Sequence, residues 1–264
     1  MRFAITGIRA TRVNLHMNDY VSGLPNPLAS IGFADTIIRR LDLKPWSAKV
    51  LPILHGVHVS VGRTRPEYAP SPKRGGLFGA AEMPEDLIGS AEVSMIVDMP
   101  GCDSEHSVLA AVKGMRFAGG VMTEEPEVSV VLRDGAALRN VPRGYAVVPA
   151  TQHRNITSFG NPDSLTAVAN ILYPEKRERG DGWLIPTAIG YRLLEDPDRA
   201  PKRRGTRRPD VPHVFAEPGV GIAELVSVRS SRLVGLPDEE FENHFWRWDA
   251  RGDLVLGHPA YHPA

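Results

Sequence analysis

The chain has 264 residues, of which 42% are hydrophobic, and this apolar content is enough to bury a sizeable core. Its 31 cationic side chains balance its 31 anionic ones, which excludes a uniformly basic protein that binds nucleic acid through net charge alone. No apolar stretch reaches the 18 or so residues that cross a bilayer, and the single cysteine, Cys102, excludes an intramolecular disulfide. We therefore expect a globular, cytoplasmic protein with no membrane partner.

Charge is distributed unevenly along the chain. Residues 1–74 and 131–209 carry an excess of Lys and Arg, whereas residues 75–130 and 210–264 carry an excess of Asp and Glu. Phosphate binding needs local cations rather than a high net charge, so the pattern favours a protein with a nucleic-acid surface. The two acidic blocks are candidates for contacts with other proteins.

Hydrophobic periodicity predicts a regular order of elements in the first half of the chain. The expected elements are a strand at 2–17, a helix at 29–43, strands at 48–63 and 90–99, a helix at 103–117 capped by Asp103 or Ser104, and a strand at 125–133. The order βαββαβ predicts an α+β, ferredoxin-like (RRM-like) sheet with two helices on one face. Its other face is then open and can meet RNA.

Two domains are expected from this order. Residues 1–135 form the ferredoxin-like core, and residues 64–89, rich in Pro and Gly and too long for a hairpin loop, are inserted in it. Residues 136–264 form an irregular, β-rich half packed against the core. Its expected elements are a helix at 163–173 and strands at 182–194, 213–228 and 245–257.

The most concentrated charge lies in a basic loop at residues 198–210. Its cations are Lys202, Arg203, Arg204, Arg207 and Arg208. They could neutralise phosphates, although mutual repulsion and the surrounding Pro and Gly residues also fit a solvated surface loop. The loss of one phosphate-binding cation is expected to flatten the salt dependence of binding by about one unit.

Three other segments carry side chains suited to RNA. The first strand has polar residues at even spacing, which places them on one face; these are Arg12, Asn14, His16 and Asn18, with Arg9 out of step. In the insertion, glycines allow close backbone approach, and the candidate contacts are Arg65, Lys73, Arg74, Leu77 and Phe78. Gln152, His153 and Arg154 offer polar groups to base edges. A solvated strand face and an apolar lid explain the same residues without RNA.

Catalytic and metal-binding patterns are weak. His213 and Glu217, four residues apart in a strand, would lie about 13 Å from each other, too far to share a metal ion. Cys102, Asp103 and His106 lie at a helix start, where capping explains them better than chemistry. The sequence has no nucleophile elbow, no HExxH helix and no phosphate-binding loop of the GxxxxGK type. We therefore expect no catalytic residue, no metal and no cofactor.

The strands of the second half carry a pattern that resembles one protein family. The matching residues are Gly182, Trp183, Leu184, Pro186, Gly190 and Tyr191, then Phe215, Glu217 and Glu224, then Phe245 and Trp246. In the first half, Asn14, Gly23, Pro25, Gly32 and Phe33 fit as well, although Leu24 stands where an aromatic residue usually precedes the Pro-bearing loop. The family is the second subunit of the type I-F CRISPR surveillance complex, the Csy complex.

This resemblance implies a Cas-five-type protein of the RAMP superfamily, with a ferredoxin-like core and residues 64–89 as its thumb. It implies a non-catalytic subunit that caps the complex, grips the 5′ handle of the CRISPR RNA and pairs with the large subunit for target DNA recognition. The expected partners are CRISPR RNA, the large subunit, the adjacent backbone subunit and, indirectly, target double-stranded DNA. Gly23 joins the expected RNA contacts, and the basic loop falls in the family's variable insert.

Two other functions fit the sequence. A metal-independent endoribonuclease that processes CRISPR repeat RNA could use His153 and a nearby Lys or Tyr as general acid and base on a 2′-hydroxyl. A protein-only adaptor would bind no RNA. Cleavage of repeat RNA without added metal identifies the first function, and purification without RNA identifies the second.

Overall fold

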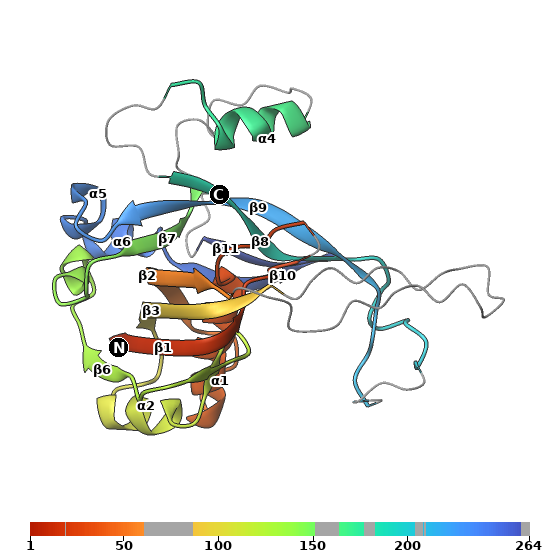
Figure 1. Cartoon of the computed structure of the whole chain (residues 1–264). Coiled ribbons are helices and arrows are strands. Elements are labelled where there is room, and N and C mark those ends of the chain that lie inside the picture. Colours follow the sequence, from red (N-terminus) through yellow and green to blue (C-terminus); the bar gives the residue numbers. More distant parts are fainter. Residues whose placement is uncertain are drawn as a thin grey trace.

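The computed structural model describes residues 1–18, 20–60, 87–150, 164–176, 183–203, 208 and 210–259. Within these residues the fold is α+β, as expected, with mostly antiparallel strands and a few short helices (Figure 1). A search of the same residues for a helix long and apolar enough to span a membrane finds none.

The first half of the chain follows the expected order of elements. It contains β1 (Arg2–Asn14), α1 (Pro27–Arg40), β2 (Lys49–Val59), β3 (Ile88–Asp98), α2 (Glu105–Val112), the short strands β4 (Arg116–Phe117) and β5 (Gly120–Met122), and β6 (Glu127–Val130). The predicted insertion at 64–89 lies outside the described residues as far as residue 86, and β3 already begins at Ile88.

The second half contributes further strands and short helices. These are η1 (Gly135–Leu138), β7 (Tyr145–Pro149), α4 (Ser164–Leu172), β8 (Trp183–Leu193), β9 (Ala216–Ser227), α5 (Ser231–Val234), α6 (Asp238–Glu242), β10 (Trp246–Arg251) and β11 (Leu254–Pro259). The strands of both halves belong to one sheet.

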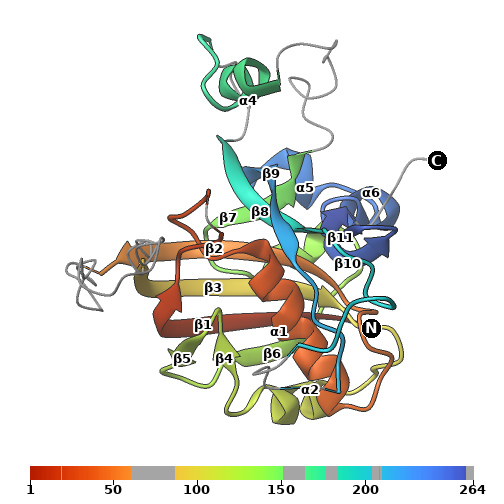
Figure 2. The ribbon, with the colours of Figure 1, turned by 90° about the vertical axis from the view of Figure 1, so that its right-hand side faces the viewer.

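The strands of the first half lie in the spatial order β2-β3-β1, with β5 and β6 paired along the other edge of β1. All of these pairs are antiparallel. The helices α1 and α2 lie together on one side of these strands (Figure 2). The Asn26 side chain accepts a hydrogen bond from the Leu28 amide at the start of α1, and Ser104, one of the two predicted caps, does the same for α2 through the Ser107 amide.

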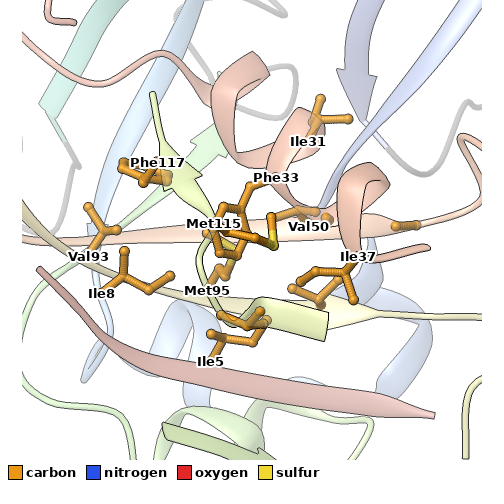
Figure 3. Close-up of a cluster of buried hydrophobic side chains, with 14 of the residues drawn as sticks. Ile5, Ile8, Ile31, Phe33, Ile37, Val50, Val93, Met95, Met115 and Phe117 are labelled. Atoms are coloured by element: carbon orange, nitrogen blue, oxygen red, sulfur yellow. The ribbon is translucent and has the colours of Figure 1, made fainter. Parts of the chain in front are cut away.

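The main core fills the space between these helices and the sheet. Ile5 and Ile8 of β1 contribute to it from the sheet, and Phe33 and Ile37 contribute from α1 (Figure 3). Phe3 of β1 belongs to the same core. Phe33 also packs edge-on against Phe117 of β4, with ring centroids 6.1 Å apart. Burial of these apolar side chains fixes which face of each strand turns toward the helices.

Two bulges in β1 keep its apolar residues on the helix side. The pairing of β1 with β3 shifts register between Ile5 and Ile8, where Gly7 has a φ of +72°, and between Thr11 and Val13, where Arg12 has a φ of +56°. Each bulge inserts one residue and therefore reverses the alternation of faces beyond it. Even spacing alone therefore misjudges the faces of this strand.

The strand face predicted from spacing needs correction at His16, Asn18 and Arg9. β1 ends at Asn14, so His16 and Asn18 lie in the following loop and not on a strand face. The spacing in the sequence placed Arg9 on the other face from Arg12 and Asn14. In the structure all three are exposed, because the extra residue in the bulge at Arg12 reverses which positions of the strand point to each face. The apolar residues Ile8, Ala10 and Val13 stay buried throughout.

The strands of the second half close a ring with β2. β2 pairs with β7, β7 with β9, β9 with β8, β8 with β11 and β11 with β10, and β10 returns to β2 through Trp246 and Val50. The Trp246 indole donates a hydrogen bond to the Val147 carbonyl across this ring, at 2.8 Å. The two halves of the chain therefore share strand pairing and core.

A second core covers part of the sheet face opposite α1 and α2. Ala4, Leu51 and Ile96 of the sheet pack there against apolar residues of η1, α5, α6 and the chain just after α6. These include Leu138, Leu233, Phe241 and Phe245. The buried Arg2 guanidinium lies over the Phe245 ring, at 4.8 Å, and pairs with Asp98 at 3.1 Å. This core covers the sheet near the start of β1 and leaves the other end of the strand exposed.

Candidate nucleic-acid interface

An exposed row of residues crosses the uncovered part of the sheet. The strand register pairs His58 with Ser90, Ser90 with Thr11, Thr11 with Val121, and Val121 with Arg116. Side chains at directly paired positions of antiparallel strands share one face. We call this row, together with Arg12 in the bulge beside Thr11, the open face. All of its residues are exposed except Ser90, which is half-buried.

The open face lies opposite the helices. The neighbours of its residues along each strand, Ala10, Ala91 and Phe117, are buried in the main core beneath α1. Because side chains alternate along a strand, the open-face residues must point the other way. The row spans five strands, or roughly 19 Å at the usual strand spacing. A four-stranded RNA-binding sheet of similar width stacks two or three bases.

Two cations of the open face have no acidic partner. Within the described residues, neither Arg12 nor Arg116 forms an ion pair, and Arg116 donates only to the Gly119 carbonyl, at 3.2 Å. Thr11, Ser90 and His58 add hydroxyl and imidazole groups between and beside them. Unpaired guanidinium groups beside short polar side chains suit a phosphate backbone with accessible bases.

Arg9 differs from these cations because two carboxylates hold it. Its guanidinium contacts Glu124 at 3.0 Å and Glu92 at 3.3 Å. The hydrogen bonds that Arg9 donates to Glu124 and then to Glu92 raise the pKa of Arg9 above its ordinary value. Its charge is therefore already compensated, and this acidic pair borders the open face on the side of the second core.

The other predicted residues near β1 serve the loop that follows it. The Asn14 side chain accepts from the His16 amide at 2.8 Å, and the Gly23 amide donates to the Leu15 carbonyl at 2.8 Å. Gly23 has a φ of +115°, which glycine adopts without strain. Asn18 accepts from the amides of Tyr20 and Val21 and donates to Gly219 of β9 at 3.4 Å, so its polar groups are used locally.

The predicted basic loop lies between the long strands β8 and β9. We call β8, β9 and the connecting residues 194–215 the arm. Arg203 is half-buried, contacts the Glu195 carboxylate at 2.7 Å and lies 4.2 Å from the centre of the Phe215 ring. The hydrogen bond from Arg203, followed by that from the Phe215 amide, lowers the pKa of Glu195. Arg208 pairs with Asp210 at 2.7 Å, and Lys202 is exposed.

The described cations of the basic loop and those of the open face lie on different elements: Lys202, Arg203 and Arg208 on the arm, Arg12 on β1 and Arg116 on β4. In Figure 2 the described chain that follows β8 passes on one side of α1, and β4 and β5 lie on the other. The remaining predicted residues lie outside the described part of the chain: Arg65, Lys73, Arg74, Leu77, Phe78, Gln152, His153, Arg154, Arg204 and Arg207.

Sequence reasoning identified only Arg12 of the open face and missed the other five residues: Thr11, His58, Ser90, Arg116 and Val121. His58, Ser90 and Arg116 come from strands far apart in the sequence and meet only through strand register. Alternation within β2 and β3 could have placed His58 and Ser90 on the polar side. Arg116 gave no such signal, because its two-residue strand lies where the sequence predicted a helix.

Elsewhere, the side chains whose chemistry would suit catalysis or metal binding make structural contacts. Among the residues that the structure describes, no three His, Cys, Asp or Glu side chains gather as a metal site would need. Cys102 is buried, and the His213 ring bonds to the Val211 carbonyl at 2.7 Å. His55 bridges Ser94 at 2.7 Å and the Arg143 carbonyl at 2.9 Å.

Several residues of the pattern noted in the second half have clear structural roles. A Cβ on Gly190 would lie 2.1 Å from the Val255 carbonyl oxygen, so the β8–β11 pairing requires glycine there. Glu224 is buried and pairs with Arg232, and Phe245 and Trp246 are core residues. Tyr191, by contrast, is 45% exposed on the arm, where burial does not explain it.

Part of the chain is similar to a known family of proteins. Residues 162–254 match a family model described as CRISPR-associated protein (Cas_Csy2). This range contains the whole pattern of the second half, from Gly182 to Trp246, whereas Asn14, Gly23 and Phe33 lie outside it. No curated protein matches the chain.

Proposed function

Through residues 162–254 the chain belongs to the type I-F Csy2 family of CRISPR-associated proteins, and from this premise we propose that it binds the 5′ handle of CRISPR RNA as a non-catalytic subunit of a Csy complex. Membership of the family implies a place in such a complex. The contact with the RNA handle is our proposal, and the open face is the surface that we assign to it.

The observation that carries the assignment is the exposed row across five strands. It offers Arg12 and Arg116, two cations with no carboxylate partner in the described part of the chain, together with the polar groups of Thr11, Ser90 and His58. Phosphate neutralisation by the cations and hydrogen bonding to unstacked bases would both be available on this row. Neither requires a catalytic group.

The arrangement of the first half supports a ferredoxin-like core. The strands β6, β1, β3 and β2 lie side by side in that order and antiparallel, and α1 and α2 connect β1 to β2 and β3 to the strands beyond. This is the order expected of βαββαβ units that present a sheet to RNA. We propose residues 1–135 as this core, residues 64–89 as its thumb, and residues 136–264 as the half packed on it.

Partners beyond the RNA follow from the same proposal. We propose that the protein pairs with the large subunit and an adjacent backbone subunit, and meets target double-stranded DNA indirectly. The acidic block at 210–264 is a weaker docking candidate than its charge suggested. Many of its carboxylates have internal partners, as Glu224 has with Arg232, Asp238 with Arg133 and Asp253 with Arg192.

Incubation of the purified protein with CRISPR repeat RNA, without added metal, tests the proposal. We expect stable binding and full-length RNA at the end of the incubation. Cleavage at one site would support the endoribonuclease, whose proposed His153 lies outside the described residues. Purified protein that neither carries nor takes up RNA would support a protein-only adaptor.

A further inference from the structure

One residue of the open face has a backbone conformation that its side chain disfavours. Arg12 has a φ of +56°, in the left-handed region, where the Cβ of an L-residue comes too close to the following carbonyl oxygen. Glycine is the usual residue there because it has no Cβ. The same strand follows that rule at its first bulge, where Gly7 has a φ of +72°. β1 therefore contains two bulges, one built on glycine and one on arginine.

Local contacts explain the other strained positions in the described residues but not Arg12. Trp46 stacks on Trp248 with ring centroids 5.7 Å apart, and Asp42 follows the end of α1 with its amide bonded to the Arg39 carbonyl. Ala118 precedes Gly119 in the two-residue turn between β4 and β5, a turn that needs positive φ at both positions. The Arg12 side chain is exposed and has no ion-pair partner among the described residues.

The bulge gives this side chain a defined position. It inserts Arg12 between Thr11 and Val13, so that Thr11 and Arg12 are both exposed while Val13 remains buried in the main core. Bulges often re-aim a side chain beside a functional site. Strain of this kind persists when the surrounding packing enforces it, and it is concentrated at binding and catalytic sites.

We propose that Arg12 is the phosphate anchor of the open face, held by its strained bulge to receive one phosphodiester of a single-stranded RNA. The RNA then runs along the row toward Arg116, away from the acidic pair of Glu92 and Glu124 that compensates the charge of Arg9. This inference rests on the proposed function and adds to it the anchoring residue and the direction of the strand across the sheet.

The anchor role predicts opposite effects on binding and stability. In Arg12→Gly, the RNA contact is lost and the backbone strain is relieved, because glycine accepts a positive φ. Arg12→Asn also removes the charge and tolerates the left-handed region. We expect RNA affinity to fall several-fold in both, and the slope of log K against log salt to become shallower by about 0.7. The melting temperature should hold or rise, by up to about 4 °C for the glycine variant.

Arg139→Gly is the matched control. Arg139 is also exposed, but it lies after η1 with a φ of −62°, so glycine relieves no strain there. We expect unchanged affinity and salt slope, with an unchanged or slightly lower melting temperature. The measurements are fluorescence anisotropy with a labelled handle RNA at several salt concentrations, and thermal unfolding of each full-length variant.

The outcomes separate the inference from the proposed function. Binding by the wild type with loss in both Arg12 variants supports the anchor. Equal affinity and slope in wild type, Arg12→Gly and Arg12→Asn would overturn the anchor but leave RNA binding intact. A clear fall in the melting temperature of both variants would also overturn it, because Arg12 would then be a stabilising residue. Failure of the wild type to bind RNA would remove the proposed function itself.

Discussion

Arg232 and Glu224 form a bidentate ion pair, with Nη1 and Nη2 of the arginine 2.6 and 2.8 Å from the two carboxylate oxygens. The Glu224 side chain is 3% exposed and that of Arg232 is 41% exposed. The pair joins β9 to α5, within the part of the chain that matches the Csy2 family. A glutamate of the pattern noted in the second half therefore has a structural role.

Removal of the arginine should be costly, because it takes away the positive charge that binds both oxygens of a buried carboxylate. We expect Arg232→Ala to lower the free energy of unfolding by about 3 kcal/mol or more in urea titrations. The control is Arg251→Ala, which breaks the more exposed pair with Asp249 and should cost less than about 1 kcal/mol. Equal losses in the two variants would contradict this reading of the pair. In the double variant Arg232→Met with Glu224→Met, part of the stability should return.

Gly190 should tolerate no side chain. Its φ of +139° and the 2.1 Å approach of a Cβ to the Val255 carbonyl combine backbone strain with a steric clash. We expect Gly190→Ala to cost about 3 kcal/mol or more and to weaken amide-exchange protection in β11. Gly235→Ala is the control, since a Cβ there meets nothing within 4 Å. An unperturbed Gly190→Ala protein would show that β8 and β11 are not paired as described.

The stability of the protein should fall in mild acid. Burial lowers the pKa of His244, and the nearby Arg232 charge acts in the same direction. Because the folded pKa lies below the unfolded value of about 6.5, the unfolded state takes up the proton first, and stability is lost as the pH falls below that value. We expect the free energy of unfolding of His244→Gln, measured in urea, to fall less between pH 7.5 and pH 5.5 than that of the wild type. Part of the fall should remain in this variant, because burial also lowers the pKa of His258. Superimposable pH profiles would exclude His244 as a source.

Arg203 should matter more for the order of the arm than for RNA. It contacts Glu195, the His213 carbonyl and the Phe215 ring, so its loss should loosen the end of the arm. We expect faster proteolytic cleavage within residues 194–215 in Arg203→Ala than in Arg199→Ala, whose side chain is 88% exposed. RNA affinity should change little in either. A large loss of affinity with unchanged proteolysis would place Arg203 in the RNA interface instead.

Strand and helix order could be predicted from the sequence because apolar periodicity reports burial directly. The helix from Pro27 to Arg40 and the strands around Val50 and Ile96 follow from their apolar patterns. Ring closure through Trp246 and Val50 could not be predicted, because it joins residues almost 200 positions apart by strand pairing that no local pattern encodes.

The candidate site was predictable only in part, for a geometric reason. Polar spacing identified Arg12 and Asn14, but the bulge at Arg12 moved Arg9 onto the same face. His58 and Arg116 reach the row through pairing with Ser90 and Val121, which depends on register and not on composition. The densest charge in the sequence lies in the basic loop of the arm, where Arg203 and Arg208 already have acidic partners.

Photo-cross-linking tests the central claim most directly. The purified complex would be assembled on CRISPR RNA with 4-thiouridine in the 5′ handle, irradiated and digested, and its cross-linked peptides identified by mass spectrometry. RNA held on the open face predicts cross-links to peptides that contain Thr11 to Asn14, His58, or Arg116 to Val121. Cross-links confined to the arm, residues 183–227, with none on those strands, would contradict the account.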